Sequence, residues 1–216
     1  DPEDTGRQYD ADVIRINSQS GKGGVSYVME QNYGICMPKK MREDFGYFIK
    51  DISDRRHREL KPKEIHAAFE KQYVNVDEPF RVDDFSLKKS GNIWRGKIFL
   101  KVNGKETILE GSGNGQLDAV SNAVCRTYGI RITNLIYSEH DLDSGSNSRG
   151  MAYFGLDDAA GRTAWGVGVD TVIITASVKA FISAVNRMDG IREKIRFRQI
   201  AETDCEKDVC ESGAGQ

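Results

Sequence analysis

Two glycine-rich segments decide the fold: residues 109–124, "LEGSGNGQLDAVSNAV", and residues 165–187, "WGVGVDTVIITASVKAFISAVNR". Each begins as a strand-like run, passes through Gly-x-Gly, and continues with apolar residues that recur every three or four positions. That spacing is typical of a helix with one buried face. The same strand-to-helix junction therefore occurs twice, which indicates an internal duplication.

Short alternating runs precede each junction and predict three strands in each copy. Asn103-Gly104, between the second and third runs, is typical of a two-residue hairpin turn. We therefore expect an α+β fold with two βββα repeats, related by a pseudo-two-fold axis and spaced by roughly 50–60 residues. The predicted strands cover residues 80–89, 94–102, 105–111, 131–140, 150–157 and 162–169.

The first third of the chain has a helical pattern. After a short extended candidate at 11–17, with Ser18 or Ser20 as a possible N-cap, apolar residues follow helical spacing in three runs. The second run begins at Pro38 and the third at Pro62, and proline is favoured at the first helical position. The charged C-terminal end predicts a frayed helix or a disordered tail. The expected division is a helical subdomain at 1–74, the duplicated domain at 75–190 and a polar tail at 191–216.

Composition excludes several classes of function. The net charge of −2 over 216 residues gives no general basic field for nucleic acid. The four cysteines and three histidines lack zinc spacing, so reduced thiols and a cytoplasmic location are expected. No apolar run approaches the roughly 20 residues of a membrane span. Because the chain begins with Asp1, we expect a piece of a longer protein.

Catalytic motifs do not match either. The segment "INSQSGKGGV" resembles a phosphate-binding loop in composition, but Ile16 and Gly23 stand where that motif requires Gly and Ser or Thr. The chain has no G-x-S-x-G and no H-E-x-x-H. The cluster Glu139-His140-Asp141 has a single histidine beside a serine- and glycine-rich stretch. We interpret it as a solvated loop in preference to a metal or acid–base site.

Gly111, Gly113 and Gly115 lie between a predicted strand and a helix N-terminus. Glycine permits positive φ and close approach, so backbone N–H groups could converge there on a small carboxylate. The helix dipole would favour that anion by about 0.3–1 kcal/mol. The alternative is that these glycines only shape tight turns and close helix–sheet packing. Recurrence of Gly-x-Gly in the second repeat favours a symmetric small-ligand site.

The sequence resembles the C-terminal part of the long form of 2-isopropylmalate synthase. The resemblance rests on "VIRINSQSGKGGVSYVMEQNYGICMPKKM" and on the two junction segments, which occur in family order over roughly residues 1–187. It implies a helical linker followed by a regulatory domain that dimerises and binds leucine as feedback inhibitor. It also implies a catalytic TIM barrel in the same longer chain. The divalent metal and acetyl-CoA belong to that barrel, whose H-x-H motif is absent here, so no cofactor and no synthase activity are expected.

The resemblance also implies the leucine-binding residues. Gln116 departs from the proline common in the family, and Asp141 is charged where a small residue is usual. Two alternatives stay open, namely an isoleucine-sensing domain of a citramalate synthase and a dimerisation module without a ligand. The implied ligand-binding residues are Gly113, Gly115, Leu117 and Asp118 from the first repeat, with Asn134, Tyr137, Asp141 and Ile173 from the second.

Overall fold

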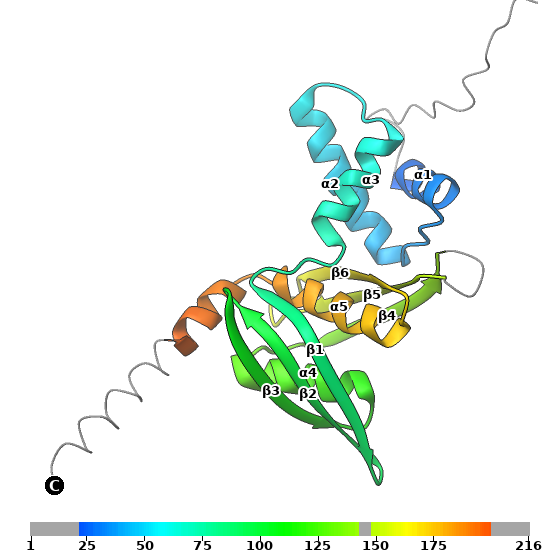
Figure 1. Ribbon diagram of the computed structural model, residues 1–216. Helices are drawn as coiled ribbons and strands as arrows, with labels where there is room; N and C mark the ends of the chain where they lie inside the picture. Colours follow the sequence, from blue (N-terminus) through cyan, green and yellow to red (C-terminus); the bar gives the residue numbers. More distant parts are fainter. Residues whose placement is uncertain (1–21, 143–147, 200–216) are drawn as a thin grey trace, which may run out of the picture. The chain divides into compact units, whose positions relative to one another are not determined.

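A computed structural model describes residues 22–142 and 148–199 (Figure 1). The extended candidate at 11–17, its possible caps and the end of the predicted tail lie outside the described residues. The chain divides into two compact units, residues 1–69 and 70–216. The division falls inside the third helix, a few residues before the boundary expected at 74.

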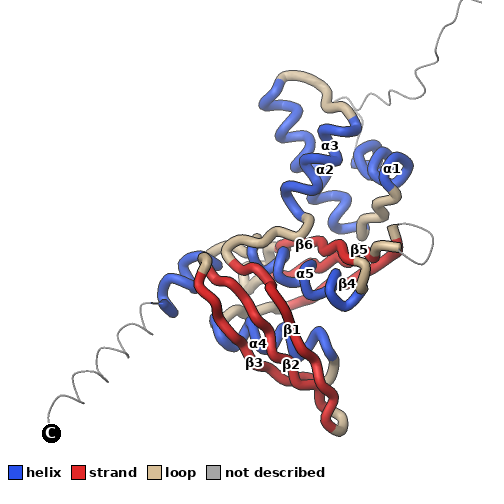
Figure 2. Tube along the Cα trace, viewed as in Figure 1, coloured by secondary structure: helices blue, strands red, loops and turns tan. Residues whose placement is uncertain are grey.

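The first unit is helical, as the apolar spacing predicts. Figure 2 shows its three helices. Met41, Phe45 and Ile49 lie on one buried face, and Phe45 packs edge-on against Phe69 with ring centroids 5.2 Å apart. Pro38 is the N-cap of the second helix and not its first helical residue. The helices are α1 (Lys22–Tyr33), α2 (Lys39–Arg56) and α3 (Pro62–Tyr73).

A local charge cluster fixes the start of α3. The Glu64 carboxylate accepts the Lys61 backbone N–H at 2.9 Å, which satisfies one of the free donors at the helix start. The Arg58 guanidinium also donates to that carboxylate at 2.9 Å. These two interactions lower the pKa of Glu64 to about 2.

The first βββα unit is an antiparallel meander in the order β1-β2-β3, followed by a helix. Asn103 and Gly104 have φ of 49° and 83°, and they join β2 to β3 where Val102 pairs with Lys105. Two successive positive φ values are what a type I′ turn requires, so the hairpin prediction is confirmed. The elements are β1 (Phe80–Ser90), β2 (Ile93–Val102), β3 (Lys105–Gly113) and α4 (Gln116–Tyr128).

The second βββα unit repeats this order, so the predicted duplication is confirmed. Its sheet is antiparallel in the order β4-β5-β6. The helix N-caps Gly115 and Val172 are 57 positions apart, and the starts of β2 and β5 have the same spacing. The elements are β4 (Asn134–Asp141), β5 (Gly150–Asp157), β6 (Thr163–Asp170) and α5 (Ile173–Asn186).

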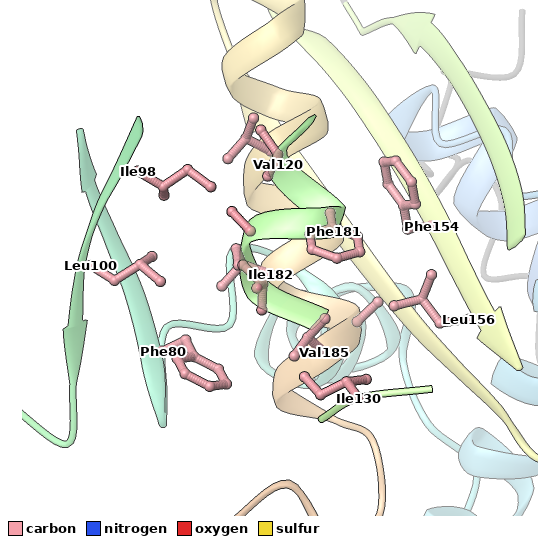
Figure 3. Close-up of a cluster of buried hydrophobic side chains, with 14 of the residues drawn as sticks. Phe80, Ile98, Leu100, Val120, Ile130, Phe154, Leu156, Phe181, Ile182 and Val185 are labelled. Carbon is pink, nitrogen blue, oxygen red and sulfur yellow. The ribbon is translucent and has the colours of Figure 1, made fainter. Parts of the chain in front are cut away.

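One hydrophobic core joins the two βββα units. Ile98 and Leu100 reach it from β2, Phe154 and Leu156 from β5, and the α5 side chains lie between these strands (Figure 3). α4 packs on β2 and β3, whereas α5 packs on β5 and β6 and also contacts β1. Both helices therefore cover the inner faces of the two sheets.

Two segments beyond the repeats are fastened to this core. Residues 191–199 are helical and bury Ile191 and Ile195, so ordered structure extends past the boundary expected at 190. Lys194 donates to the Gly129 carbonyl at 2.8 Å, which places a cation at the negative end of α4. Before β1, the Val76 carbonyl accepts from the Asn186 side-chain amide at 2.8 Å. None of the described helices combines the length and hydropathy that crossing a membrane requires.

Candidate functional site: the helix starts and the β4 surface

The Gly-x-Gly segments bring strand and helix backbones into close approach. A Cβ on Gly111 would overlap the carbonyl of Ala119 and lie 2.5 Å from the Ala123 nitrogen. In the second βββα unit, a Cβ on Gly168 would overlap the carbonyl of Ala176 and lie equally close to the next turn of α5. The same residue spacing in both units shows that these glycines serve close helix–sheet packing.

The expectation of positive φ at these glycines is wrong. Gly115 has φ of −135° and ψ of 169°, which is extended backbone. Gly111 and Gly113 are paired residues of β3 and are also outside the positive-φ region. The alternative of close helix–sheet packing is confirmed for Gly111, where the absent Cβ is needed and the conformational freedom is not.

The α4 start already holds a carboxylate of the chain itself. Asp118 Oδ2 accepts the Asn114 backbone N–H at 2.8 Å, and Oδ1 accepts from Asn122 Nδ2 at 3.2 Å. The N-cap Gly115 supplies no side-chain hydrogen bond, so other donors of the first turn lack a capping side chain. Leu117 is half-buried against the core. This group therefore combines backbone donors, one acidic side chain and an apolar contact.

A second group lies where β4 meets α5. The Tyr137 hydroxyl is 2.9 Å from Ser177 Oγ and also donates to the Glu139 carboxylate. Burial and the neighbouring Glu139 raise the pKa of Tyr137 to about 12. The side chain of Ile173 lies over Gly150, since a Cβ there would be 2.7 Å from Ile173 Cδ1.

This second group is apolar and exposed. Leu135, Tyr137, Val172 and Ile173 keep exposed fractions of 45%, 39%, 52% and 41%. Asp141 lies on the same side of β4 as Tyr137, opposite Gly150, because alternate residues of a strand share a face. The structure therefore brings Tyr137, Asp141 and Ile173 to one surface.

Asn134 has a different environment. Its side-chain amide donates to Asp157 Oδ2 at 2.8 Å, and its position in β4 places it on the opposite face from Tyr137. The eight implied residues thus form an α4 group, a β4–α5 group and Asn134 by itself.

Glu139, His140 and Asp141 belong to β4, so the interpretation of this cluster as a loop is wrong. His140 stacks on Tyr153 with ring centroids 5.5 Å apart, whereas Glu139 faces the Tyr137 side. Because successive residues of a strand point to opposite faces, the three side chains do not converge.

Sequence reasoning missed an ion pair at the α5 start. Asp170 Oδ1 accepts the Val172 N–H at 3.0 Å, and Lys179 donates to Oδ2 at 2.7 Å. Burial acts to raise the pKa of Asp170, but Lys179 and the Val172 N–H lower it by more. An acidic residue two positions after Gly168, followed by the single cation of an apolar helix, was the available signal.

Comparison with known proteins identifies the class of domain. Residues 59–189 match the model of the LeuA allosteric (dimerisation) domain, and residues 1–30 match an alpha-isopropylmalate synthase, post-catalytic domain-like family. The chain belongs to the LeuA allosteric (dimerisation) domain family, which confirms the resemblance drawn from the junction segments.

Relatives named 2-isopropylmalate synthase match most of the chain. One from Desulfitobacterium hafniense is 47% identical over 188 residues, covering 87% of this chain and 34% of the relative. One from Helicobacter hepaticus is 40% identical over 87% of this chain and 35% of the relative. One from Paraburkholderia xenovorans is 36% identical over 97% of this chain and 36% of the relative. The chain thus spans about a third of the length of these curated relatives.

Proposed function

We propose that this chain is the C-terminal regulatory part of a 2-isopropylmalate synthase and binds leucine as feedback inhibitor. The observation that carries the proposal is the match of residues 59–189 to an allosteric domain, together with relatives that bear this enzyme name. The condensation of acetyl-CoA with 2-oxoisovalerate, with its divalent metal, belongs to a catalytic TIM barrel outside this chain. The regulatory part supplies no catalytic residue.

The two residue groups have the chemistry that leucine needs. Backbone N–H groups at the α4 start suit the carboxylate, because a helix N-terminus carries free donors and a partial positive charge. Asp118 or a backbone carbonyl can accept from the ammonium group, and Asn134 remains a further candidate. The side chain suits the apolar surfaces of Leu117, Tyr137 and Ile173.

A homodimer is the second part of the proposal. Four large apolar side chains, two on β4 and two at the start of α5, have exposed fractions of 39% to 52%. An apolar cluster at a sheet edge is a common interaction surface. A second chain related by a two-fold axis would cover this surface, and it could bring the α4 group of one chain next to the β4–α5 group of the other. Light scattering should therefore give twice the mass of the chain, and Val172→Asp should shift the equilibrium toward the monomer.

The decisive test is calorimetric titration of the 216-residue chain with leucine and, separately, isoleucine. Gly113→Val is a poor probe, because a Cβ there would crowd Asp118 and lie 2.7 Å from the Ala119 nitrogen, so the fold itself would suffer. Gly115→Val is a better probe of leucine binding, since nothing lies within 4 Å of a Cβ at that position. Its bulk would block approach to the backbone donors while leaving the packing intact.

We expect leucine to bind stoichiometrically, Gly115→Val to weaken it at least tenfold, and the control Thr107→Val to leave it unchanged. Tighter binding of isoleucine would favour the citramalate synthase alternative, since one methyl placement is worth about 1–3 kcal/mol. If neither amino acid gives a heat of binding, the alternative that remains is a dimerisation module without a ligand. In the whole enzyme, Gly115→Val should relieve inhibition by about 5–150-fold with uninhibited turnover nearly intact.

A further inference from the structure

A wide groove on the sheet β1-β2-β3 has no part in the proposed leucine site. Its cavity volume is about 690 Å³, within the range of about 300–1,000 Å³ typical of small-molecule sites. α4 packs on the other face of β2 and β3, against buried residues such as Ile98. The groove is lined by Ser86, Lys88, Arg95, Gly96, Lys97, Glu110, Gly111, Ser112 and Arg126.

Strand register places the polar side chains of the groove in two rows. Ser86, Lys97 and Glu110 are cross-strand neighbours in one row. Lys88, Arg95 and Ser112 are neighbours in the other. Because these positions alternate with the buried ones, all six point away from the core. Adjacent rows on one face are within reach of a single small ligand.

The groove is strongly cationic. It has four basic side chains and one carboxylate, Glu110, which pairs with Lys97 at 2.9 Å. Within residues 22–142 and 148–199, Lys88, Arg95 and Arg126 form no ion pair with a carboxylate. The chain as a whole carries a net charge of −2, so this local excess of positive charge runs against its average.

One feature of this arrangement works against stability. Lys88 and Arg95 are directly opposite each other in the antiparallel pair β1–β2. Like charges in that position repel and destabilise a sheet. Conflicts of this kind between local sequence and fold occur chiefly where function requires them. An anion lying across the pair would turn the repulsion into two attractive contacts.

We propose that this groove binds a small organic polyanion of nucleotide size, with at least two phosphate groups, through the paired Lys88 and Arg95. The Ser86 and Ser112 hydroxyls supply uncharged donors beside the cations. A second copy of the chain is a poor occupant, because a two-fold contact would set these cations against each other. The groove and the leucine site use different residues, so occupation of one does not require the other.

The test titrates ADP and inorganic pyrophosphate into the 216-residue chain by calorimetry, at low and at physiological salt. The variant is Lys88→Gln/Arg95→Gln, and the matched control is Lys105→Gln/Arg131→Gln, which removes the same charge outside the groove. Removing a cation from a charge-assisted contact typically weakens binding by about tenfold or more. Because the double variant removes a like-charge pair, its unfolding midpoint should be unchanged or raised.

We expect one ADP to bind per chain. The affinity for ADP should fall at least about tenfold per removed cation in the double variant and stay unchanged in the control variant. Saturating leucine should leave this affinity unchanged. Pyrophosphate binding as tightly as ADP would assign the contacts to the phosphates alone. Equal weakening in variant and control would mean general charge attraction and overturn the proposal, as would the absence of binding to either probe. Leucine binding with no ADP binding would overturn this proposal and leave the proposed function standing.

Discussion

The two βββα units share their chain order but differ in how deeply they are buried. Five of the 13 residues of α4 are buried, whereas ten of the 14 residues of α5 are. Likewise, β5 is buried at seven of its eight positions, whereas β2 alternates between buried and exposed residues. The β5 strand and α5 helix of the second βββα unit are therefore more deeply buried than β2 and α4, and the first βββα unit keeps one sheet face open to solvent. The two units therefore have the same order of elements but different degrees of burial.

The largest expected difference concerns equivalent helix positions. Phe181 of α5 is 2% exposed and packs edge-on against Phe154, whereas its counterpart 57 positions earlier is Val124 of α4. Phe181→Ala should cost about 3–5 kcal/mol and Val124→Ala about 2 kcal/mol, because the larger cavity leaves more contacts unfilled. Urea unfolding measures both. Equal losses would show that the larger side chain of Phe181 adds no more packing energy than Val124, which is equally buried.

A smaller effect should come from the glycines that are equivalent in the two units. A Cβ on Gly168 or Gly111 would overlap a helix carbonyl and force strand and helix apart. Each change to alanine should cost about 2 to 3 kcal/mol, with Gly168 the larger because the approach is closer there. Gly115→Ala is the matched control without a close contact, and it should cost no more than about 1 kcal/mol, because alanine is a poorer N-cap than glycine. A tolerated Gly168→Ala would contradict the packing role of the Gly-x-Gly segments.

The carboxylates at the two helix starts give a third contrast. In the second unit Asp170 comes from the end of β6 and pairs with Lys179, whereas in the first unit Asp118 comes from α4 itself. The folded-state pKa of Asp170 lies below its ordinary value, so its stabilisation is present above about pH 4 and is lost as the pH falls further. Asp170→Asn should cost about 1 kcal/mol at pH 7.

That cost should be smaller at pH 3 than at pH 7, because the stabilisation by the ionised carboxyl decreases as the pH falls below about 4. Unfolding free energies of wild type and Asp170→Asn at both pH values measure it. A cost independent of pH would assign the effect to packing in place of charge.

The smallest effect is expected at Tyr137, whose counterpart in the strand register of the first sheet is Phe85. Its pKa is raised to about 12, so the folded protein keeps the phenol protonated where an unfolded chain, with a pKa of about 10, has lost the proton. Tyr137 thus lowers stability progressively between about pH 10 and pH 12. The difference in phenolate absorbance between wild type and Tyr137→Phe should show one late ionisation. A midpoint near pH 10 would contradict the burial of this hydroxyl.

Local patterns in the sequence predicted most of the elements. The Asn103-Gly104 turn has few other conformations, so it fixed the β2–β3 register. Prediction was incomplete at two places, where strand pairing and burial decide how far an element extends. The cluster at 139–141 is strand because it pairs with β5, and the helix at 191–199 is held by burial of Ile191 and Ile195.

The sequence by itself determined the order of helices and strands, the duplication and the family, because periodicity, turn residues and motif order are local properties of the chain. Only the tertiary structure decided why the Gly-x-Gly segments contain glycine, and which implied residues share a surface. Tyr137 and Ser177 meet across 40 positions of sequence, and Asn134 turns away from both. Such proximity depends on how the sheets and helices pack, and packing is set by the shapes of all the side chains together.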